Sequence, residues 1–238
     1  MTLLRKRYIH NDYIFKRDGD EVVLIRDFEG MYRNCEDPHG QSMEMDNLSY
    51  HLVGTVLDRA VSILQRSTAA PLAIIDIGCG LGYFTAHLKH RFPFAHVCGV
   101  DISVAALQRA KCMAPACRFE HVDVKSPDLR VEGGKRYHLA IAMDTLYYFK
   151  DDEIAGVMNN VRGLIADHGY LMVGYHLPQE MRFGRYIQSL EDAKRMISRH
   201  NFELVYSFDV HNMLDKSYDG QCLGRHLYFL ARKIGSDD

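Results

Sequence analysis

The amino-acid sequence predicts an α/β protein with a doubly wound, mostly parallel seven-stranded sheet and an antiparallel C-terminal strand. Three observations predict this class. Between residues 72 and 201, short apolar runs alternate with helical segments. These runs are apolar throughout, as strands are when helices cover both faces of their sheet. A polar segment too short for a crossover helix joins the last two runs, so we expect these two strands to be antiparallel neighbours.

Residues 1–45 precede this alternation, and we expect them to form an N-terminal helical extension to a domain at 46–238. Two apolar segments of the extension flank a polar stretch that contains Gly19, a pattern typical of a hairpin. The expected elements are a hairpin that pairs 13–15 with 22–25, a short helix at 26–36, and a loop at 37–40 with Pro38 and Gly40 as helix breakers.

The main domain is expected to begin with a helix at 46–66, because Leu48, Leu52 and Val56 start an apolar series at helical spacing. Strands and helices then alternate, which specifies a parallel sheet in one domain. The expected strands are 72–78, 96–103, 118–124, 137–144, 169–176, 202–210 and 225–233, and the expected helices are 83–91, 104–114, 153–165 and 190–201.

Composition limits the classes of function. Hydrophobic residues make up 47% and charged residues 25% of the 238 residues, which excludes disordered, collagen-like and membrane-spanning chains. The formal charge of -2 provides no general field for nucleic acid or an anionic membrane, so we expect a small-molecule partner. The N-terminal segment has no hydrophobic signal core, so we expect a cytoplasmic protein. A homodimer is left open.

The six cysteines are scattered through the chain. They form no CxxC pair, and no histidine run at zinc spacing accompanies them. We therefore interpret them as buried free thiols, with Cys79 as a small filler, and expect no metal site.

A glycine loop with Gly78, Gly80 and Gly82 lies between a buried strand and a helix start. Glycine in such a turn permits a positive φ and lets a ligand approach the backbone closely. A dinucleotide site needs the pattern GxGxxG, but its third glycine is replaced here by Tyr83. Asp76 also precedes the loop by two residues, where negative charge does not help a dinucleotide. The loop therefore favours another nucleoside cofactor, although a tight turn alone would also use glycines.

Two further acids follow the next two strands. Asp101 stands 23 residues after Gly78, where a carboxylate can accept both hydroxyls of a ribose. Asp123, with the Val124 amide, can read an adenine amino group and ring nitrogen. Both acids and Asp76 fall at the carboxyl ends of neighbouring strands, where open α/β sheets bind ligands. Capping a turn is the alternative for Asp123, and satisfying loop amides is the alternative for Asp76.

The motifs DIGCGLG (76–82), GVDIS (99–103), HVDV (121–124) and AMDTLYYF (142–149) resemble those of class I S-adenosylmethionine-dependent methyltransferases. The resemblance covers residues 46–233 and implies the Rossmann-like methyltransferase fold with S-adenosylmethionine as cofactor. It implies that Gly78 and Gly80 line the methionine part and that Asp144 lies near the methionine part and the substrate. It also assigns Asp101 to the ribose and Asp123 with Val124 to the adenine, and the full predicted cofactor set adds Asp76, Gly82 and Ile102.

Within that class, DTLYYF (144–149) and YRNCEDPHG (32–40) resemble the nodulation protein S type of small-molecule N-methyltransferase. The segment DPHG replaces the DPW of that type. The resemblance therefore favours a small-molecule acceptor, such as a sugar or a natural-product intermediate, and leaves N- and O-methylation open.

Catalysis of methyl transfer mainly requires alignment of the nucleophile with the methyl carbon. An alcohol acceptor also needs a general base, and His176, Asp144 and Tyr147 are our catalytic candidates, with Tyr148 as a neighbour. The alternatives are that His176 is a loop histidine with its hydrogen bonds satisfied and that Tyr147 and Tyr148 only pack in the core. The extension is expected to cover the cofactor as a lid; candidate pocket residues are Tyr32, His39, Tyr50 and His51 from this region, and Arg182 and Arg185 for an acidic acceptor.

Three rival functions are the alternatives to a small-molecule methyltransferase. A nucleic-acid amino-methyltransferase usually has a Pro-Pro-aromatic run after the fourth strand, where this chain has DTLYYF, and the chain lacks a basic aromatic stripe. A nicotinamide-dependent oxidoreductase is disfavoured by Tyr83. A noncatalytic cofactor-binding regulatory protein is the rival outside enzymology, and a methyl-transfer assay separates it from the enzyme.

Overall fold

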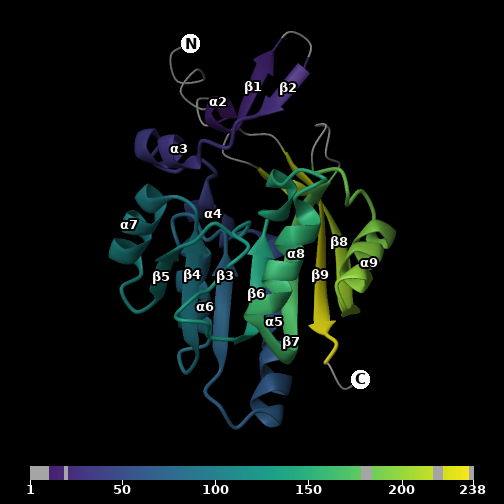
Figure 1. The fold of residues 1–238 in the computed structure, drawn as a ribbon. Helices are drawn as coiled ribbons and strands as arrows, with labels where there is room; N and C mark the ends of the chain where they lie inside the picture. The colour runs from purple at the N-terminus through teal and green to yellow at the C-terminus, as the bar shows by residue number, and fades with distance from the viewer. Residues whose placement is uncertain (1–10, 19–20, 178–183, 217–221, 236–238) are drawn as a thin grey trace.

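The computed structural model describes residues 11–18, 21–177, 184–216 and 222–235. Its centre is a seven-stranded sheet with the strand order β5-β4-β3-β6-β7-β9-β8 (Figure 1). The strands are β3 (Ala73–Ile77), β4 (His96–Asp101), β5 (Arg118–His121), β6 (Tyr137–Met143), β7 (Ile165–Leu177), β8 (Phe202–Lys216) and β9 (Cys222–Lys233).

The sheet is mixed and mostly parallel. β3 is parallel to β4 and β6, β4 is parallel to β5, and β6 is parallel to β7. β9 runs antiparallel to both of its neighbours, β7 and β8. This arrangement confirms the predicted fold class, including the antiparallel C-terminal strand.

Helices cover both faces of the sheet. The helices of the main domain are α5 (Leu48–Ser67), α6 (Tyr83–Arg91), α7 (Val104–Met113), the 3-10 helix η1 (Leu146–Tyr148), α8 (Ile154–Leu164) and α9 (Leu190–Arg199). The apolar faces of α8 and α9 pack with Ile75 and Ile77 of β3, whereas α5 and α6 pack with Ile74 of the same strand. Because successive strand side chains point to opposite faces, a continuously apolar strand supplies both cores.

The strand and helix positions agree with the sequence prediction, with two corrections. The expected third strand at 118–124 ends at His121, so Asp123 lies in the turn that follows it. The polar segment expected between the last two strands is mostly strand, because β8 continues to Lys216 and β9 begins at Cys222. Polar side chains are tolerated there because a hairpin edge needs only backbone hydrogen bonds to continue.

The N-terminal extension contains a hairpin and a short helix, as expected, but the hairpin pairs Phe15–Asp18 with Glu21–Leu24 instead of 13–15 with 22–25, and residues 13–14 are helical. Its elements are α2 (Asn11–Ile14), β1 (Phe15–Asp18), β2 (Glu21–Leu24), α3 (Phe28–Asn34) and the short helix α4 (Gln41–Glu44), which the sequence analysis did not predict. β1 and β2 pair antiparallel, with Phe15 opposite Leu24. Figure 1 shows the extension at the end of the molecule where the parallel strands have their carboxyl ends.

Polar contacts hold the extension on the main domain. Glu29 of α3 accepts hydrogen bonds from the Ser103 hydroxyl at 2.8 Å and the Ala105 amide at 3.1 Å, at the start of α7. These bonds, led by that of the Ala105 amide, hold the pKa of Glu29 below its usual value. Arg109 of α7 donates back to the carbonyl oxygens of Tyr32 and Cys35. A carboxylate at a helix N-terminus is stabilised by the helix dipole, so Glu29 fixes the extension over α7.

Candidate active site

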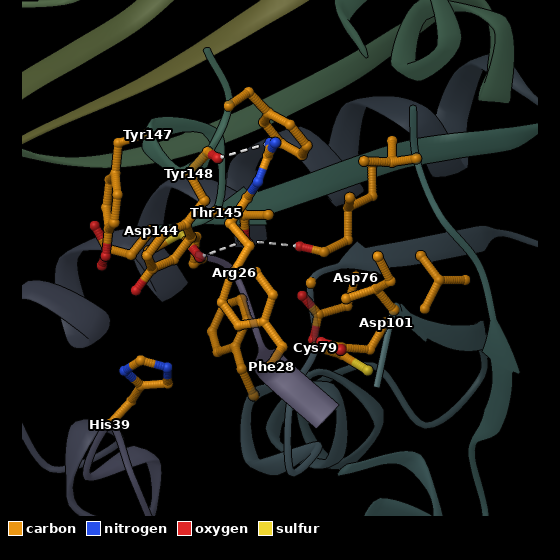
Figure 2. A pocket seen from close by; sticks show the side chains of 18 of the residues that line it. Arg26, Phe28, His39, Asp76, Cys79, Asp101, Asp144, Thr145, Tyr147 and Tyr148 are labelled. Carbon is orange, nitrogen blue, oxygen red and sulfur yellow. Dashed lines mark hydrogen bonds between the residues drawn. The ribbon is translucent and has the colours of Figure 1, made fainter. Parts of the chain in front are cut away.

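A cavity of about 760 Å³ lies between the carboxyl ends of the parallel strands and the extension. Residues at the carboxyl ends of β3, β4, β6 and β7, residues after β5 and one residue of β9 line it, together with residues of the extension. Figure 2 shows Asp76, Asp101 and Cys79 on one side of this cavity and Asp144, Tyr147 and Tyr148 on the other. This volume lies within the range of ordinary small-molecule sites, roughly 300–1,000 Å³.

The glycine loop forms one wall of the cavity through Gly78. Gly78 has φ +74°, and a Cβ atom there would lie 2.5 Å from Oγ1 of Thr145. Thr145 is fixed in this place because its hydroxyl group lies 3.0 Å from the Ile77 carbonyl oxygen and 2.9 Å from that of Met143. The loop thus needs glycine at position 78 both for its backbone conformation and for the close approach of Thr145.

Gly80 and Gly82 shape the loop without lining the cavity. Both have positive φ values, +53° and +79°. A Cβ atom on Gly80 would lie 2.5 Å from the Tyr32 hydroxyl, and one on Gly82 would lie 2.9 Å from Ala110. The neighbours of these two positions are the extension and α7, and the predicted contact of both glycines with the cofactor stays a prediction.

Asp101 ends β4 and lines the cavity, as expected. Its two carboxylate oxygens accept the amide hydrogens of Gly80 and Ser103, each at 2.8 Å. Burial raises the pKa of this carboxyl group, and the backbone hydrogen bonds oppose that rise. Asp101 therefore holds the glycine loop against β4 while it faces the cavity.

Asp76 is almost fully buried, with 3% of its surface exposed. Its only hydrogen bond among the described residues comes from the Thr85 hydroxyl at 2.6 Å. Burial raises the pKa of Asp76 to about 7, with a smaller contribution from the nearby Asp101. A positively charged ligand group in the cavity would favour the ionised form of this carboxyl.

Asp123 and Val124, which are predicted to bind the adenine, line the cavity on the β4–β5 side together with Ile102 of the predicted cofactor set. Asp123 Oδ1 also accepts the Lys125 amide hydrogen at 2.9 Å. The side chain therefore caps the turn after β5, which was the alternative role, and still borders the cavity.

Asp144 follows β6 and has a positive φ of +48°, which is unusual for a residue with a side chain. Its amide donates to the Gly174 carbonyl oxygen at 3.0 Å, which fixes this backbone conformation against β7. Its Oδ1 atom is buried and has no hydrogen-bond partner among the described residues. Strained residues of this kind concentrate at functional sites.

His176 and Tyr147, the other two catalytic candidates, also line the cavity. The Tyr147 ring lies 4.5 Å from that of Tyr148, which in turn meets the ring of Phe28 edge-on at 5.1 Å. The three catalytic candidates are thus brought to the half of the cavity beside β6, β7 and β9, away from the acids of β3, β4 and β5.

Of the other pocket candidates, Tyr32, His39 and Tyr50 line the cavity. His51 and Arg185 are exposed and lie outside its lining. Their assignment to the pocket is therefore corrected; His51 lies on a solvent-facing side of α5, where a charged or polar residue is favoured. Arg182 lies outside the described residues.

Several lining residues were missed by the sequence analysis, above all His226 of β9. His226 pairs in register with His176 across the antiparallel β7–β9 ladder, and their ring centroids lie 4.7 Å apart. Arg26 of the extension and Lys125 also line the cavity. Spacing along the chain gives no sign of these residues, because strand register and a distant ion pair place them.

Two features are absent from the parts of the chain that the structure describes. No cluster of three or more histidine, cysteine or acidic side chains with metal-binding geometry occurs in them. No helix there combines the length and apolar character needed to cross a bilayer.

Residues 75–171 match a family model described as a methyltransferase domain. Trans-aconitate 2-methyltransferase of Enterobacter sp. (strain 638) is 46% identical over 52 residues, which cover 22% of this chain and 21% of that protein. Malonyl-[acyl-carrier protein] O-methyltransferase of Acetivibrio thermocellus is 28% identical over 149 residues, 61% of this chain and 48% of that protein. The matched region thus spans less than half of either curated relative.

Solved structures share the fold at low sequence identity. The N-methyltransferase NodS of Bradyrhizobium japonicum WM9 in complex with S-adenosyl-L-homocysteine has a TM-score of 0.60 and 18% identity, covering 87% of this chain and 98% of that one. The magnesium protoporphyrin IX methyltransferase of Synechocystis PCC 6803 with bound S-adenosylmethionine has a TM-score of 0.54 and 19% identity, covering 76% and 80%. The family match shows a methyltransferase domain over residues 75–171, and the strand order and the solved structures show that the chain has the fold of S-adenosylmethionine-dependent methyltransferases.

Proposed function

We propose that this protein transfers the methyl group of S-adenosylmethionine to a small-molecule acceptor, such as a sugar or a natural-product intermediate, on nitrogen or oxygen. The single observation that carries this proposal is the division of one cavity into two chemically different halves. One half has the glycine loop and the acids Asp101 and Asp123, and the other has Asp144, His176 and Tyr147. A cofactor and an acceptor need two such adjoining sites.

The residues of the first half fit S-adenosylmethionine. Gly78 brings the loop backbone to the cavity surface without a side chain in the way. Asp101 and Asp123 offer carboxylate oxygens for ribose hydroxyls and an adenine amino group. Buried Asp76, whose carboxyl has a raised pKa, suits the neighbourhood of a cationic ligand. When bound, the cofactor supplies a methyl group on a positively charged sulfur.

In this proposal the chain's own residues mainly position the acceptor and exclude water. Alignment of two reacting groups can lower a barrier by roughly 7–11 kcal/mol in favourable cases. Asp144, His176 and Tyr147 are proposed to bind and orient the acceptor, and a histidine on the β7–β9 side removes its proton where the acceptor needs it. The aromatic rings of Tyr148 and Phe28 give this half an apolar wall.

Residues 1–45 are proposed to act as a lid over both halves. Ile25, Arg26 and Phe28 line the cavity from above, and Gln41 accepts the Leu81 amide hydrogen of the glycine loop at 2.8 Å. A cover of this kind excludes water from the reacting groups. Its contact with the loop couples cofactor binding to lid closure.

A methyl-transfer assay tests the proposed function. The full chain is incubated with S-adenosylmethionine that carries a radioactive methyl group and with a panel of small amines, alcohols and carboxylic acids. Transfer to at least one member supports the proposal. Binding of S-adenosyl-L-homocysteine without transfer to any panel member favours the noncatalytic cofactor-binding regulator, and tighter binding of NADH favours the oxidoreductase.

A further inference from the structure

The acceptor half of the cavity contains two polar side chains, Asp144 and His226, that approach each other without a direct hydrogen bond. Oδ2 of Asp144 and Nε2 of His226 lie 4.0 Å apart. This is too long for a direct hydrogen bond. Oδ1 of the same aspartate and Nδ1 of the same histidine are buried and have no hydrogen-bond partner among the described residues. Buried polar atoms without partners are rare and require an explanation.

The surrounding backbone holds these two side chains in place. The positive φ of Asp144 and the hydrogen bond from its amide to the Gly174 carbonyl oxygen fix the backbone of Asp144. The β7–β9 register fixes the position of His226. His226 also packs between the rings of His176 at 4.7 Å and Tyr228 at 5.8 Å. A gap of 4.0 Å between two fixed polar atoms leaves room for one polar atom of a ligand to hydrogen-bond to both.

We propose that Asp144 Oδ2 and His226 Nε2 together bind the nucleophilic group of the acceptor, that this group is an amine, and that His226 accepts its proton. The inference rests on the proposed function and names its acceptor class. It replaces His176 by His226 as the proton-accepting histidine, because His226 is the one within ion-pair distance of Asp144.

The charge of the site selects an amine over a carboxylate. Asp144 has no cationic side-chain partner within 4.0 Å among the described residues, other than His226 when protonated. The arginine and the lysine of the cavity lining, Arg26 and Lys125, are both paired with Glu153. An aspartate without an arginine or lysine partner repels a carboxylate acceptor and attracts an ammonium group, and the neighbouring tyrosine rings also favour a cation.

Atoms and charges balance in the proposed methyl transfer. An ammonium group bound between the two atoms gives one proton to Nε2 of His226, and Asp144 stabilises the imidazolium that results. The freed nitrogen lone pair forms a bond to the methyl carbon. The bond between that carbon and sulfur breaks, and its electron pair stays on sulfur. The products are the methylated ammonium, S-adenosyl-L-homocysteine and protonated His226.

Binding of two matched probes tests the site without knowledge of the natural acceptor. 2-Phenylethylamine and phenylacetate are titrated into the full chain saturated with S-adenosyl-L-homocysteine, and the imidazole NMR signals of His226 and His176 are followed. We expect the amine to bind at least tenfold more tightly than the acid and to shift the His226 signal more. We also expect Asp144→Asn to remove this preference. Equal or tighter binding of the acid, or an unchanged preference in Asp144→Asn, overturns the inference.

Turnover provides the second arm. Among the panel of acceptors, methyl transfer should go to amines and not to carboxylic acids. His226→Gln should slow it about 100-fold, a typical loss for a proton acceptor, whereas His176→Gln should slow it less than tenfold. Transfer to acids, or equal slowing in both variants, overturns the assignment. Failure of S-adenosyl-L-homocysteine to bind the wild-type chain contradicts the proposed function itself, which separates the two outcomes.

Discussion

Arg26, which lines the cavity, and Glu153, 127 residues later in the sequence, form a two-point ion pair. Arg26 donates to the two carboxylate oxygens of Glu153 at 2.5 and 3.0 Å, and to the Tyr148 carbonyl oxygen at 3.4 Å, the contact drawn in Figure 2. Lys125 approaches the same carboxylate to 3.5 Å. The pair therefore joins the extension to the start of α8.

Replacing Glu153 by Gln should loosen the extension. The hydrogen bond from Arg26 is the main cause that lowers the pKa of Glu153 to about 2. Both side chains are about one-fifth exposed, so we expect a loss of about 1 kcal/mol at pH 7, measured by urea unfolding. A depressed carboxyl pKa stabilises the fold above its ordinary value of 4.5, and this contribution is lost as the pH falls towards 2.

The exposed pair of Asp209 and Arg225 provides the control for this variant. Both of its side chains are more than 40% exposed, so Asp209→Asn should change stability less than Glu153→Gln. Limited proteolysis should also cut Glu153→Gln faster than wild type within the extension. Equal cleavage rates would show that the ion pair does not hold the lid.

Gly78→Ala should disrupt the glycine loop. The positive φ of +74° strains any side-chain-bearing residue, and the new methyl group would lie 2.5 Å from Thr145 Oγ1. We expect a destabilisation of about 2 kcal/mol or more and at least a tenfold loss of affinity for S-adenosyl-L-homocysteine. Adding Thr145→Ala should restore part of the stability and part of the affinity, because it removes the Oγ1 and Cγ2 atoms that the new methyl group would meet.

Gly156→Ala in α8 is the matched control, since nothing lies within 4 Å of a Cβ atom there. A glycine-to-alanine change inside a helix should stabilise the protein by about 0.5–1 kcal/mol. If Gly78→Ala behaves like Gly156→Ala, the loop does not depend on the close approach of Thr145.

Asp76→Asn should change the pH dependence of stability. Burial raises the pKa of Asp76 from 3.8 to about 7, so the folded state binds a proton that the unfolded state has already lost. Wild-type stability should therefore fall as the pH rises from about 4 to about 7 and then level off. The variant removes this contribution, so its melting temperature relative to wild type should rise by several degrees between pH 5 and pH 8.

The variant Thr85→Val tests the same titration, because the Thr85 hydroxyl donates the hydrogen bond that favours the ionised Asp76 carboxylate. Its removal should raise the pKa of Asp76 further, so the loss of stability with pH should continue to a higher pH in Thr85→Val than in wild type. Parallel melting curves for all three proteins across this pH range would contradict a buried, titrating Asp76.

Most of the fold could be predicted from sequence because buried strands are marked by unbroken apolar runs. β3 and β4 are examples, with every residue of β3 buried. The lengths of the two outer strands, β8 and β9, were underestimated for the opposite reason. The ends of β8 and β9 are polar, and polar residues in a strand resemble a loop when only composition is considered. The four-residue helix α4 is too short to show a helical period.

The cofactor half of the site was also accessible from sequence, because parallel strands bring Asp76, Asp101 and Asp123 to one edge. The acceptor half was only partly accessible. His226 reaches the cavity through the register of an antiparallel pair, and a shift by one residue would turn it to the other face. Arg26 depends on a partner far away in the chain, which no local pattern indicates.

Isothermal titration with S-adenosyl-L-homocysteine measures whether the cavity binds the demethylated cofactor. We expect one molecule bound per chain, and a loss of at least tenfold in affinity for Asp101→Asn, whose carboxylate faces the cavity and accepts the Gly80 amide hydrogen. The melting temperature of the variant shows whether it remains folded. Absence of binding to the wild-type chain, or equal affinity in a folded Asp101→Asn variant, would contradict the account.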